Sequence, residues 1–577
     1  MTESREKGIN RKRKCLWLSL GLWLLIMSQY VGWKLTKDGN IHWTVSGTGF
    51  LLLISLLISV ILSLGLLALE EWISCRKAKG ERKSSDASIG KLPGLRIYYV
   101  LALITMLLCW LPGYLAYYPG ICAYDMPIQV GQIVSGNYGT HHPLAHTLLI
   151  GGFMNLGSML GDVNTGIALY TAFQMICLAI TFAAGITWLR TLGVKKFWVR
   201  LVWIYCCLFP FHWYMSITVT KDVFFTIFFL LQMICFCQLL HLKERSLRFC
   251  RWDIGYLLST IGMILFRNNG MYALLVVICF LIVGCLRRHP DRKLVLRLLM
   301  TAIAGLVAGS LILSLLTKVT GAQQGDKREM LSLPIQQLAR TMIYHGDVDV
   351  LPEDDATMDE RDRQLINDFI LDEGYREYRP DIADPVKRHT YTYVARYRAK
   401  EFLQTYLHLL AEYPGDYVNA ALAVNLGYYY IGDISHAHIN ENGLERGLGY
   451  IQTRWVVEEL RDYGIYKDSK WDSLHRVMED YADQNGYLHT PVLRFIMIPG
   501  IYLWIYLFPA VFLWIRRRYL LLLPVTSVAG YYLTLVLGPT VQLRYLYPVM
   551  VAVPLLLLFI ITEYRRENNN RMVEQHE

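Results

Sequence analysis

A single acidic residue stands out in a loop that carries few other charges. Asp125 is the only Asp or Glu between the apolar segment that ends near residue 117 and Asp162, and residues 118–165 contain no Lys or Arg. A carboxylate beside a membrane surface is suited to accept a proton from a hydroxyl group, so Asp125 is a candidate general base. The structural alternative is a helix N-cap, because Asp often caps a helix that begins with a proline-containing turn.

Three histidines follow Asp125 in the sequence NYGTHHPLAHT (137–147). His142 and His146 stand four residues apart, so on a helix they share one face, and His141 precedes them. Imidazole and carboxylate groups suit divalent cations, which makes Asp125, His142 and His146 a candidate metal site. The same residues equally suit a phosphate or hydrogen bonds inside the fold. A divalent metal is the one cofactor that these residue types indicate.

Two further loops place cations beside apolar segments. Lys221 and Asp222 begin one such segment, and Arg267, Asn268 and Asn269 form a turn between two others. Ionisable residues at membrane depth are costly and by default indicate function. Lys221 and Arg267 suit a lipid-linked phosphate, the arginine through its fork of donors. The structural alternatives are a helix-dipole contact for Asp222, snorkelling for Lys221 and turn capping for the asparagines.

Arg544 enters the last apolar segment beside Tyr545. Aromatic residues are common where a span meets the membrane surface, but this does not explain an arginine on the less basic side. Together, one carboxylate, three histidines and three cations are expected on one membrane face. Such a set suits an anionic, lipid-anchored substrate, whereas solute carriers more often hold ionisable residues near the middle of their spans.

The elements that position these loops are apolar segments of membrane-spanning length. The 577 residues are 54% hydrophobic and only 18% charged, which excludes a soluble enzyme. Because about 20 apolar residues cross a bilayer as a helix, the pattern predicts an all-α polytopic membrane protein with about twelve transmembrane helices. The predicted spans lie near residues 16–33, 50–70, 97–117, 166–189, 198–215, 222–242, 253–267, 271–286, 294–316, 493–515, 519–537 and 545–562.

The distribution of positive charge predicts the orientation of the spans. The N-terminus, alternate short loops and the C-terminal tail hold 32 Lys and Arg residues, whereas the opposite short loops hold five. Cytoplasmic loops carry the excess of basic residues, so we expect a multi-pass protein of the cell membrane with both termini in the cytoplasm. Since the basic residues lie beside spans and no nucleic-acid motif is present, no nucleic-acid partner is expected.

Residues 317–492 form a separate polar region with 19 basic and 30 acidic residues. Helix-period stretches dominate it, so we expect a mostly helical extracytoplasmic domain inserted before the last three spans. The expected order is a two-span extension (1–96), a membrane core (97–316) with the catalytic loop 118–165, the acidic domain (317–492), the last three spans (493–562) and a cytoplasmic tail (563–577).

In its order of motifs the chain resembles the type-C membrane glycosyltransferases (GT-C), in particular bacterial members of this superfamily. An outer-loop Asp, an HHP–H segment, a KD at a span start, an RNNG turn and a terminal RY–YP span are arranged as in protein O-mannosyltransferase-like and aminoarabinose-transferase-like enzymes. The resemblance covers roughly 97–316 and 493–562. The chain departs from the family in residues 1–96, in the acidic domain, and in having no second acidic residue adjacent to Asp125.

The resemblance implies transfer of a sugar from a polyprenyl-phosphate donor to a glycan, lipid or protein acceptor of the cell envelope, with inversion. Asp125 would act as the general base, and Lys221, Arg267 and Arg544 would stabilise the leaving phosphate. The histidines and the other polar residues named above would line the substrate site, and membrane lipids would surround it. Two other functions stay open, namely a flippase or transporter of lipid-linked glycans and a polysaccharide polymerase or ligase.

Overall fold

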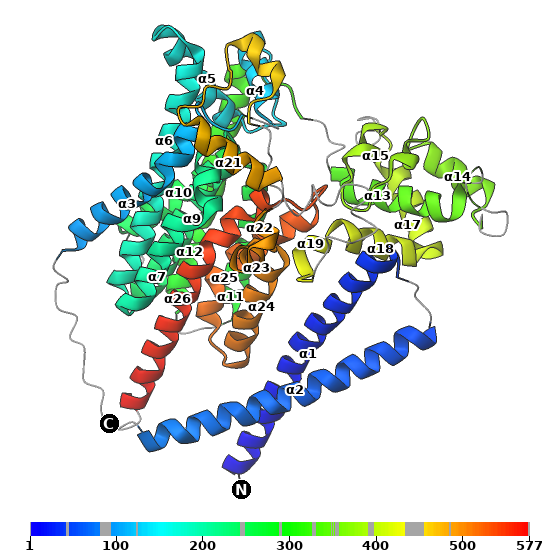
Figure 1. The fold of residues 1–577 in the computed structure, drawn as a ribbon. Helices are drawn as coiled ribbons and strands as arrows, with labels where there is room; N and C mark the ends of the chain where they lie inside the picture. Colours follow the sequence, from blue (N-terminus) through cyan, green and yellow to red (C-terminus); the bar gives the residue numbers. More distant parts are fainter. Residues whose placement is uncertain are drawn as a thin grey trace.

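The computed structural model is built almost entirely of helices (Figure 1). It describes residues 2–41, 45–80, 94–122, 125–242, 249–287, 291–325, 330–347, 349, 351, 357–390, 397–432, 455–483 and 486–574. Within these ranges, extended pairing is limited to isolated bridges. The chain is therefore an all-α membrane protein that crosses the bilayer several times.

Nine helices in the described ranges are long and apolar enough to cross a membrane. They are α1 (Thr2–Asp38), α2 (Val45–Gly80), α3 (Leu95–Ala116), α6 (Val163–Thr191), α9 (Lys221–Leu242), α11 (Asn268–Leu286), α12 (Arg292–Thr320), α25 (Tyr519–Val536) and α26 (Leu543–Glu574). A tenth candidate is the pair α23 (Pro491–Met497) and α24 (Gly500–Ile515), which is bent by 68°. The two helices are separated at Ile498, which is extended (φ −75°, ψ 112°), the conformation that a residue before a proline favours.

The predicted span near 198–215 is broken into two shorter helices, α7 (Lys196–Leu208) and α8 (Pro210–Ile217). Pro210 stands in the first turn of α8. The break lies at Phe209, whose backbone is extended (φ −68°, ψ 117°), the conformation that a residue before a proline favours.

The predicted span near 253–267 is α10 (Arg251–Phe266), which has only 16 residues. At 1.5 Å per residue it is about 24 Å long, shorter than the hydrocarbon core of a typical bilayer. α10 nevertheless packs against α9 and runs antiparallel to it: Arg267, which follows the end of α10, pairs with Asp222 at the start of α9. The number of twelve crossings remains a prediction.

Helix α9 lies at the centre of the bundle, in contact with α6, α10, α25 and α26. In the most apolar 18-residue stretch of α9, 89% of the residues are buried inside the protein. Phe225 and Phe229 of α9 pack against Tyr531 of α25, with ring centroids 4.9 and 5.7 Å apart. Buried aromatic pairs of this kind contribute to stability beyond their area. Lys221 and Asp222 lie in the first turn of α9 and are therefore held in place by a well-packed helix.

Short helices between α12 and α23 form a further region, part of which stands beside the bundle and part of which lies against it (Figure 1). They are α13 (Ser332–Thr341), the π-helix η2 (Met342–Gly346), α14 (Glu360–Asn367), η3 (Gly374–Glu377), α15 (Asp384–Arg388), α17 (Ala399–Glu412), α18 (Pro414–Val424), α19 (Leu426–Tyr429), η5 (Glu458–Tyr463), α21 (Asp472–Asp483) and α22 (Gly486–His489). We call this region the outer domain, after its predicted side of the membrane. The helices from α13 to α18 have a buried core of their own, in which Ile335, Leu338 and Val386 are fully buried. The later helices pack on the bundle instead, where η5 contacts α4 and α21 contacts α3.

The outer domain is held to the bundle at several points. The α1 end contacts it, since Arg340 donates to the Asn40 side chain at 2.8 Å. The loop before α26 contacts it as well, through a 2.9 Å hydrogen bond from Ala383 N–H to the Pro539 carbonyl. We call the end of the bundle that meets the outer domain the domain end.

Candidate active site

Two loops at the domain end run side by side and align the first two site residues. Ile121 N–H donates to the Ile217 carbonyl at 2.9 Å, and Val219 N–H donates to the Ile121 carbonyl at 2.9 Å. This parallel pairing brings Asp125, four residues after Ile121, next to Lys221, two residues after Val219. The close approach depends on Gly120, whose φ is +145°, because a side chain there would collide with Thr171 and with the Ile217 carbonyl.

Asp125 and Lys221 form a direct ion pair, with Lys221 Nζ 2.7 Å from Asp125 Oδ2. Asp125 occupies the N-cap position of α4 (Met126–Ser135), yet its side chain makes no capping hydrogen bond. The carboxylate is directed to Lys221 instead, so helix capping does not account for this residue. His142 lies beside the pair, its Nδ1 3.4 Å from Lys221 Nζ and 4.0 Å from Asp125 Oδ2.

Arg544 at the start of α26 joins this pair to a second one. Its Nη1 is 3.6 Å from Asp125 Oδ2 and 3.9 Å from Asp222 Oδ2. Asp222, whose side chain is fully buried, also pairs with Arg267 and accepts a 3.1 Å hydrogen bond from Thr220. We call Asp125, Lys221, Asp222, Arg267 and Arg544 the ion cluster; its members come from four separate segments of the chain.

Tyr545 lies between the two arginines of the ion cluster. The guanidinium carbons of Arg267 and Arg544 are 4.7 and 4.8 Å from its ring centroid. Arg544 is also held by a 2.6 Å hydrogen bond from its Nε to Gln542. Cation–π contacts and the side-chain hydrogen bond fix both guanidinium groups in place. Tyr545 is thus a positioning residue for the two arginines.

The charges around Asp125 decide its protonation. Burial by itself favours the neutral acid, but Lys221 and then Arg544 outweigh it and hold the pKa of Asp125 well below 3.8. Burial lowers the pKa of His142 to about 4, with Asp125 opposing the shift. At neutral pH the loop therefore presents an ionised carboxylate next to a neutral imidazole.

The tautomer of His142 follows from its neighbours. Lys221 has only donors, so His142 Nδ1 must accept from it and Nε2 must carry the proton. His142 is 2% exposed, and its Nε2 has no hydrogen-bond partner among the described residues. A buried donor favours an acceptor beside it, so Nε2 is a candidate contact for a ligand oxygen.

His146 has a different environment from His142. Gln129 contacts its Nδ1 at 3.0 Å and Tyr170 contacts its Nε2 at 2.8 Å. Tyr170 in turn donates to Gln174 at 3.0 Å, so the ring is held in a chain of buried hydrogen bonds. Because both ring nitrogens are engaged, His146 has no lone pair to offer a metal.

The remaining predicted residues lie at the margin of the site. His141 is exposed and packs edge-on against the ring of His142, with centroids 4.6 Å apart. Asn268 is exposed and Asn269 is partly buried at the start of α11, and no described contact joins either side chain to the ion cluster. No group of three His, Cys, Asp or Glu side chains within the described ranges could hold a metal ion. The geometry of Asp125, His142 and His146 thus does not match the metal site that their spacing indicated.

A segment of the outer domain braces the loop that carries Asp125. Cys122 N–H donates to the Trp455 carbonyl at 2.7 Å, and the Trp455 indole donates to the Tyr117 carbonyl at 2.9 Å. The Trp455 ring packs on Tyr117 and His475, with centroids 5.5 and 4.2 Å away. Sequence reasoning did not identify this contact, because 333 residues separate Cys122 from Trp455 and neither residue belongs to a motif.

Comparison with protein families gives one match. A family described as "Family of unknown function (DUF6020)" matches residues 135–574, which is most of the chain, so the protein belongs to that family. No curated protein and no solved structure matches the chain.

Proposed function

We propose that this member of the DUF6020 family is a membrane glycosyltransferase. It moves a sugar from a polyprenyl-phosphate donor to a cell-envelope acceptor on the outer-domain side of the membrane, with inversion. The observation that carries the proposal is the ion cluster, which combines a candidate base with cations that suit a phosphate. Lys221 and Arg544 contact Asp125 directly. In a bacterial cell this side would lie outside the cytoplasm, as the positive-inside rule predicts.

The charge of the ion cluster suits one phosphodiester. Its three cations and two carboxylates give a net charge of +1, and a polyprenyl-phosphate sugar carries a single negative charge at its phosphodiester. Cations in a buried site stabilise such a charge far better than they would in water. A pyrophosphate-linked glycan brings more negative charge than this cluster neutralises, so the balance favours monophosphate-linked donors.

The same charges account for the reaction. Asp125 takes the proton of the acceptor hydroxyl as its oxygen attacks the anomeric carbon, and the bond between that carbon and the phosphate oxygen breaks. The leaving phosphate monoester then carries a second negative charge. Protonation of Asp125 raises the net charge of the cluster to +2 at the same step, so the growing negative charge is matched. Attack from the face opposite the phosphate inverts the anomeric centre.

Asp125 becomes a stronger base when the donor binds. In the unliganded protein Lys221 and Arg544 keep its pKa low. A phosphate held by the same two cations offsets their effect on the carboxylate, which raises the pKa of Asp125 toward its ordinary value. His142 Nε2–H lies beside this group and supplies a further donor for a phosphate or sugar oxygen. The cations supply charge stabilisation directly, so we expect transfer to continue when divalent metal is chelated.

The test compares Asp125→Asn with wild-type protein on a panel of polyprenyl-phosphate sugars, with cell-envelope glycan as the acceptor. We expect transfer to fall by about 10²- to 10⁴-fold, the usual contribution of a general base. Donor binding should persist, because the three cations remain. Asp162→Asn is the matched control: Asp162 caps α6 through its side chain, and asparagine caps equally well.

Retained transfer in Asp125→Asn would remove this residue from catalysis. A second function, transport of lipid-linked glycans, uses the same cations but needs no base. If the wild-type protein moves a lipid-linked glycan between leaflets of a vesicle and transfers no sugar from any donor, the transporter replaces the transferase. Use of pyrophosphate-linked donors alone would instead favour a polymerase or ligase.

A further inference from the structure

One stretch of the outer domain has the composition of a membrane segment. Residues 417–432 read YVNAALAVNLGYYYIG and contain no Asp, Glu, Lys, Arg or His, although they belong to the acidic region of the chain. The stretch covers most of α18 and the whole of α19. Its 16 residues are fewer than the roughly 20 that cross a bilayer as a helix. Apolar stretches of this length are typical of buried core helices and of re-entrant membrane segments, and their position in the fold decides between the two.

Contacts with α1 set the depth of this stretch. Gln29 of α1 donates to the Tyr429 carbonyl at 2.9 Å and accepts from Ile431 N–H at 2.9 Å. Gln29 lies nine residues before the end of α1, which is about 13 Å along the helix. It also precedes Trp33 and Lys34 by about one turn, and such residues are typical of the surface of a membrane. The tip of the stretch therefore lies below that surface, in the leaflet at the domain end.

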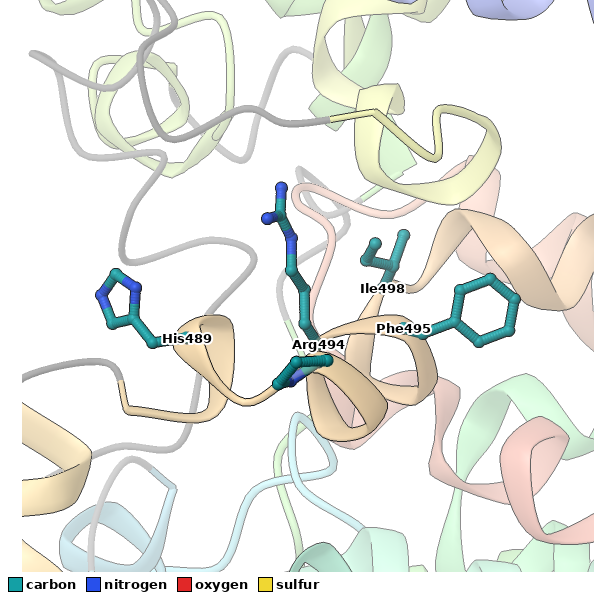
Figure 2. A pocket seen from close by; sticks show the side chains of 5 residues that line it. His489, Arg494, Phe495 and Ile498 are labelled. Carbon is teal, nitrogen blue, oxygen red and sulfur yellow. The ribbon is translucent and has the colours of Figure 1, made fainter.

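The opposite side of the stretch meets the start of α24. The Trp504 indole of α24 donates to the Tyr429 carbonyl at 2.8 Å. Ile498 lies in the link that leads into α24 (Figure 2), and the helix begins at Gly500. A side chain at position 500 would collide with the Tyr430 carbonyl, so glycine allows the two segments to approach closely. The stretch is thus enclosed between two helices, and Figure 1 shows α19 between α1 and the bundle.

The hydrogen bonds of the turn are those that a non-helical backbone requires inside a membrane. Hydrocarbon offers no partner to a free backbone group, so an irregular segment is tolerated there only where protein groups satisfy it. The Tyr429 carbonyl and Ile431 N–H are both paired with Gln29, and the Tyr428 carbonyl accepts from the Tyr532 hydroxyl at 3.3 Å. A polar residue such as Gln29 within an apolar span is costly unless it has a role of this kind.

The stretch has an enclosed side and an open side. Tyr428 is 2% exposed, and its ring packs against Tyr532 of α25 with centroids 5.8 Å apart. Ile431, by contrast, is 38% exposed, and Val418 earlier in the stretch is 42% exposed. At the depth of Gln29 the medium around the bundle is acyl chains, and an exposed isoleucine suits hydrocarbon better than water.

We propose that residues 417–432 form a re-entrant segment, which enters the leaflet at the domain end between α1 and α24 and places Ile431 against acyl chains. The chain is back at the domain end by Trp455, whose carbonyl accepts from Cys122 N–H. The sequence-based assignment of residues 317–492 to one extracytoplasmic domain thus contains a part that lies in the membrane. The segment joins the first span to the bundle within the lipid. This inference does not depend on the glycosyltransferase proposal.

Photolabelling of the wild-type, full-length protein in lipid nanodiscs tests the proposal. An apolar phenyldiazirine dissolves in the acyl chains and, on illumination, reacts with the side chains that contact them; peptide mass spectrometry then locates the label. We expect label at Ile431 and also at Leu311, a residue of the spanning helix α12 that is 64% exposed. Asn367, an exposed residue of α14 in the outer domain, should carry none.

A second measurement uses a charged, water-soluble maleimide on Ile431→Cys and on the matched control Asn367→Cys, with wild type as the background for the native cysteines. We expect the thiol at position 431 to react at least about tenfold more slowly than the thiol at position 367. The thiolate is the reactive form, and apolar surroundings suppress it. The photolabelling result stands on wild-type protein even if Ile431→Cys does not fold.

Label at Ile431 together with slow maleimide reaction would support the re-entrant segment. Maleimide reaction as fast as at position 367 would overturn it, because the tip would then lie in water. Slow maleimide reaction without diazirine label, while Leu311 is labelled, would also overturn it, since Ile431 would then be covered by protein rather than by lipid.

Discussion

Removal of Arg267 tests whether the buried half of the ion cluster holds the bundle together. Arg267 and Asp222 pair at the junction of α9, α10 and α11, with side-chain exposures of 8% and 0%. We consider Arg267→Gln, which keeps a side chain of similar length and polarity but removes the charge. Asp222 then keeps Thr220 as a hydrogen-bond donor and Arg544 at 3.9 Å as its nearest cation.

The expected cost follows from these contacts. Breaking a buried ion pair by removing one partner costs about 3–5 kcal/mol, because the other charge is left uncompensated. Arg544 and Thr220 recover part of this cost. Lost cation–π contacts to Tyr545 and Tyr531 add about 1 kcal/mol. We therefore expect the free energy of unfolding to fall by about 3 kcal/mol.

A double-mutant cycle separates the ion pair from other effects. Reversible unfolding in mixed micelles, followed by tryptophan fluorescence, gives the stability of wild type, Arg267→Gln, Asp222→Asn and the double variant. The sum of the two single losses should exceed the loss in the double variant by a coupling of about 2 kcal/mol, because the double variant leaves neither partner of this pair charged. The control is Arg461→Gln, which breaks an exposed pair and should change stability by less than about 1 kcal/mol. Additive losses would refute the reasoning, since they would mean that the two charges do not depend on each other.

Two further predictions concern the loop that carries Asp125. Because burial lowers the pKa of His142 to about 4, the unfolded chain takes up a proton at this residue first as the pH falls. Stability is therefore lost between about pH 6.5 and pH 4, by at most about 3 kcal/mol, and His142→Gln should flatten this part of the stability profile. Equal acid sensitivity of the two proteins would show that His142 is not the group responsible. Trp455→Ala removes the indole that braces Tyr117, so amide hydrogen exchange in residues 117–122 should become faster. Trp471→Ala, at an exposed tryptophan, is the control, and unchanged exchange in Trp455→Ala would argue against the brace.

The sequence predicts the members of the ion cluster better than their arrangement. Asp125, Lys221, Arg267 and Arg544 could be identified because each is an ionisable residue at an end of an apolar segment, and such residues need a reason to be there. The fold brings these four together at the domain end. Their pairing could not be predicted, since it depends on the register between Ile121 and Thr218, and a backbone bridge leaves no trace in composition.

Other parts of the sequence-based prediction fail for identifiable reasons. His142 and His146 share a sequence pattern, but one has an unpartnered nitrogen and the other is enclosed by Gln129 and Tyr170. Neutral hydrogen-bond partners far along the chain carry no spacing signal, so the pattern alone left a metal, a phosphate and hydrogen bonds inside the fold all open. Span prediction from apolar length also overlooks the break before Pro210, because apolar length does not record that Phe209, the residue before this proline, has an extended backbone.

The division of labour among the cations follows from their exposure. Arg267 is enclosed by Asp222, Tyr545 and Tyr531, so its side chain is held in place and has little freedom to move toward a substrate. Lys221 and Arg544, with side-chain exposures of 16% and 11%, face the partly open carboxylate of Asp125. A phosphate that enters the site must therefore compete with Asp125 for these two cations. Under the proposed mechanism this competition controls the base. The Asp125 carboxylate is released from the two cations only when the donor is bound, and until then it stays a weak base toward water.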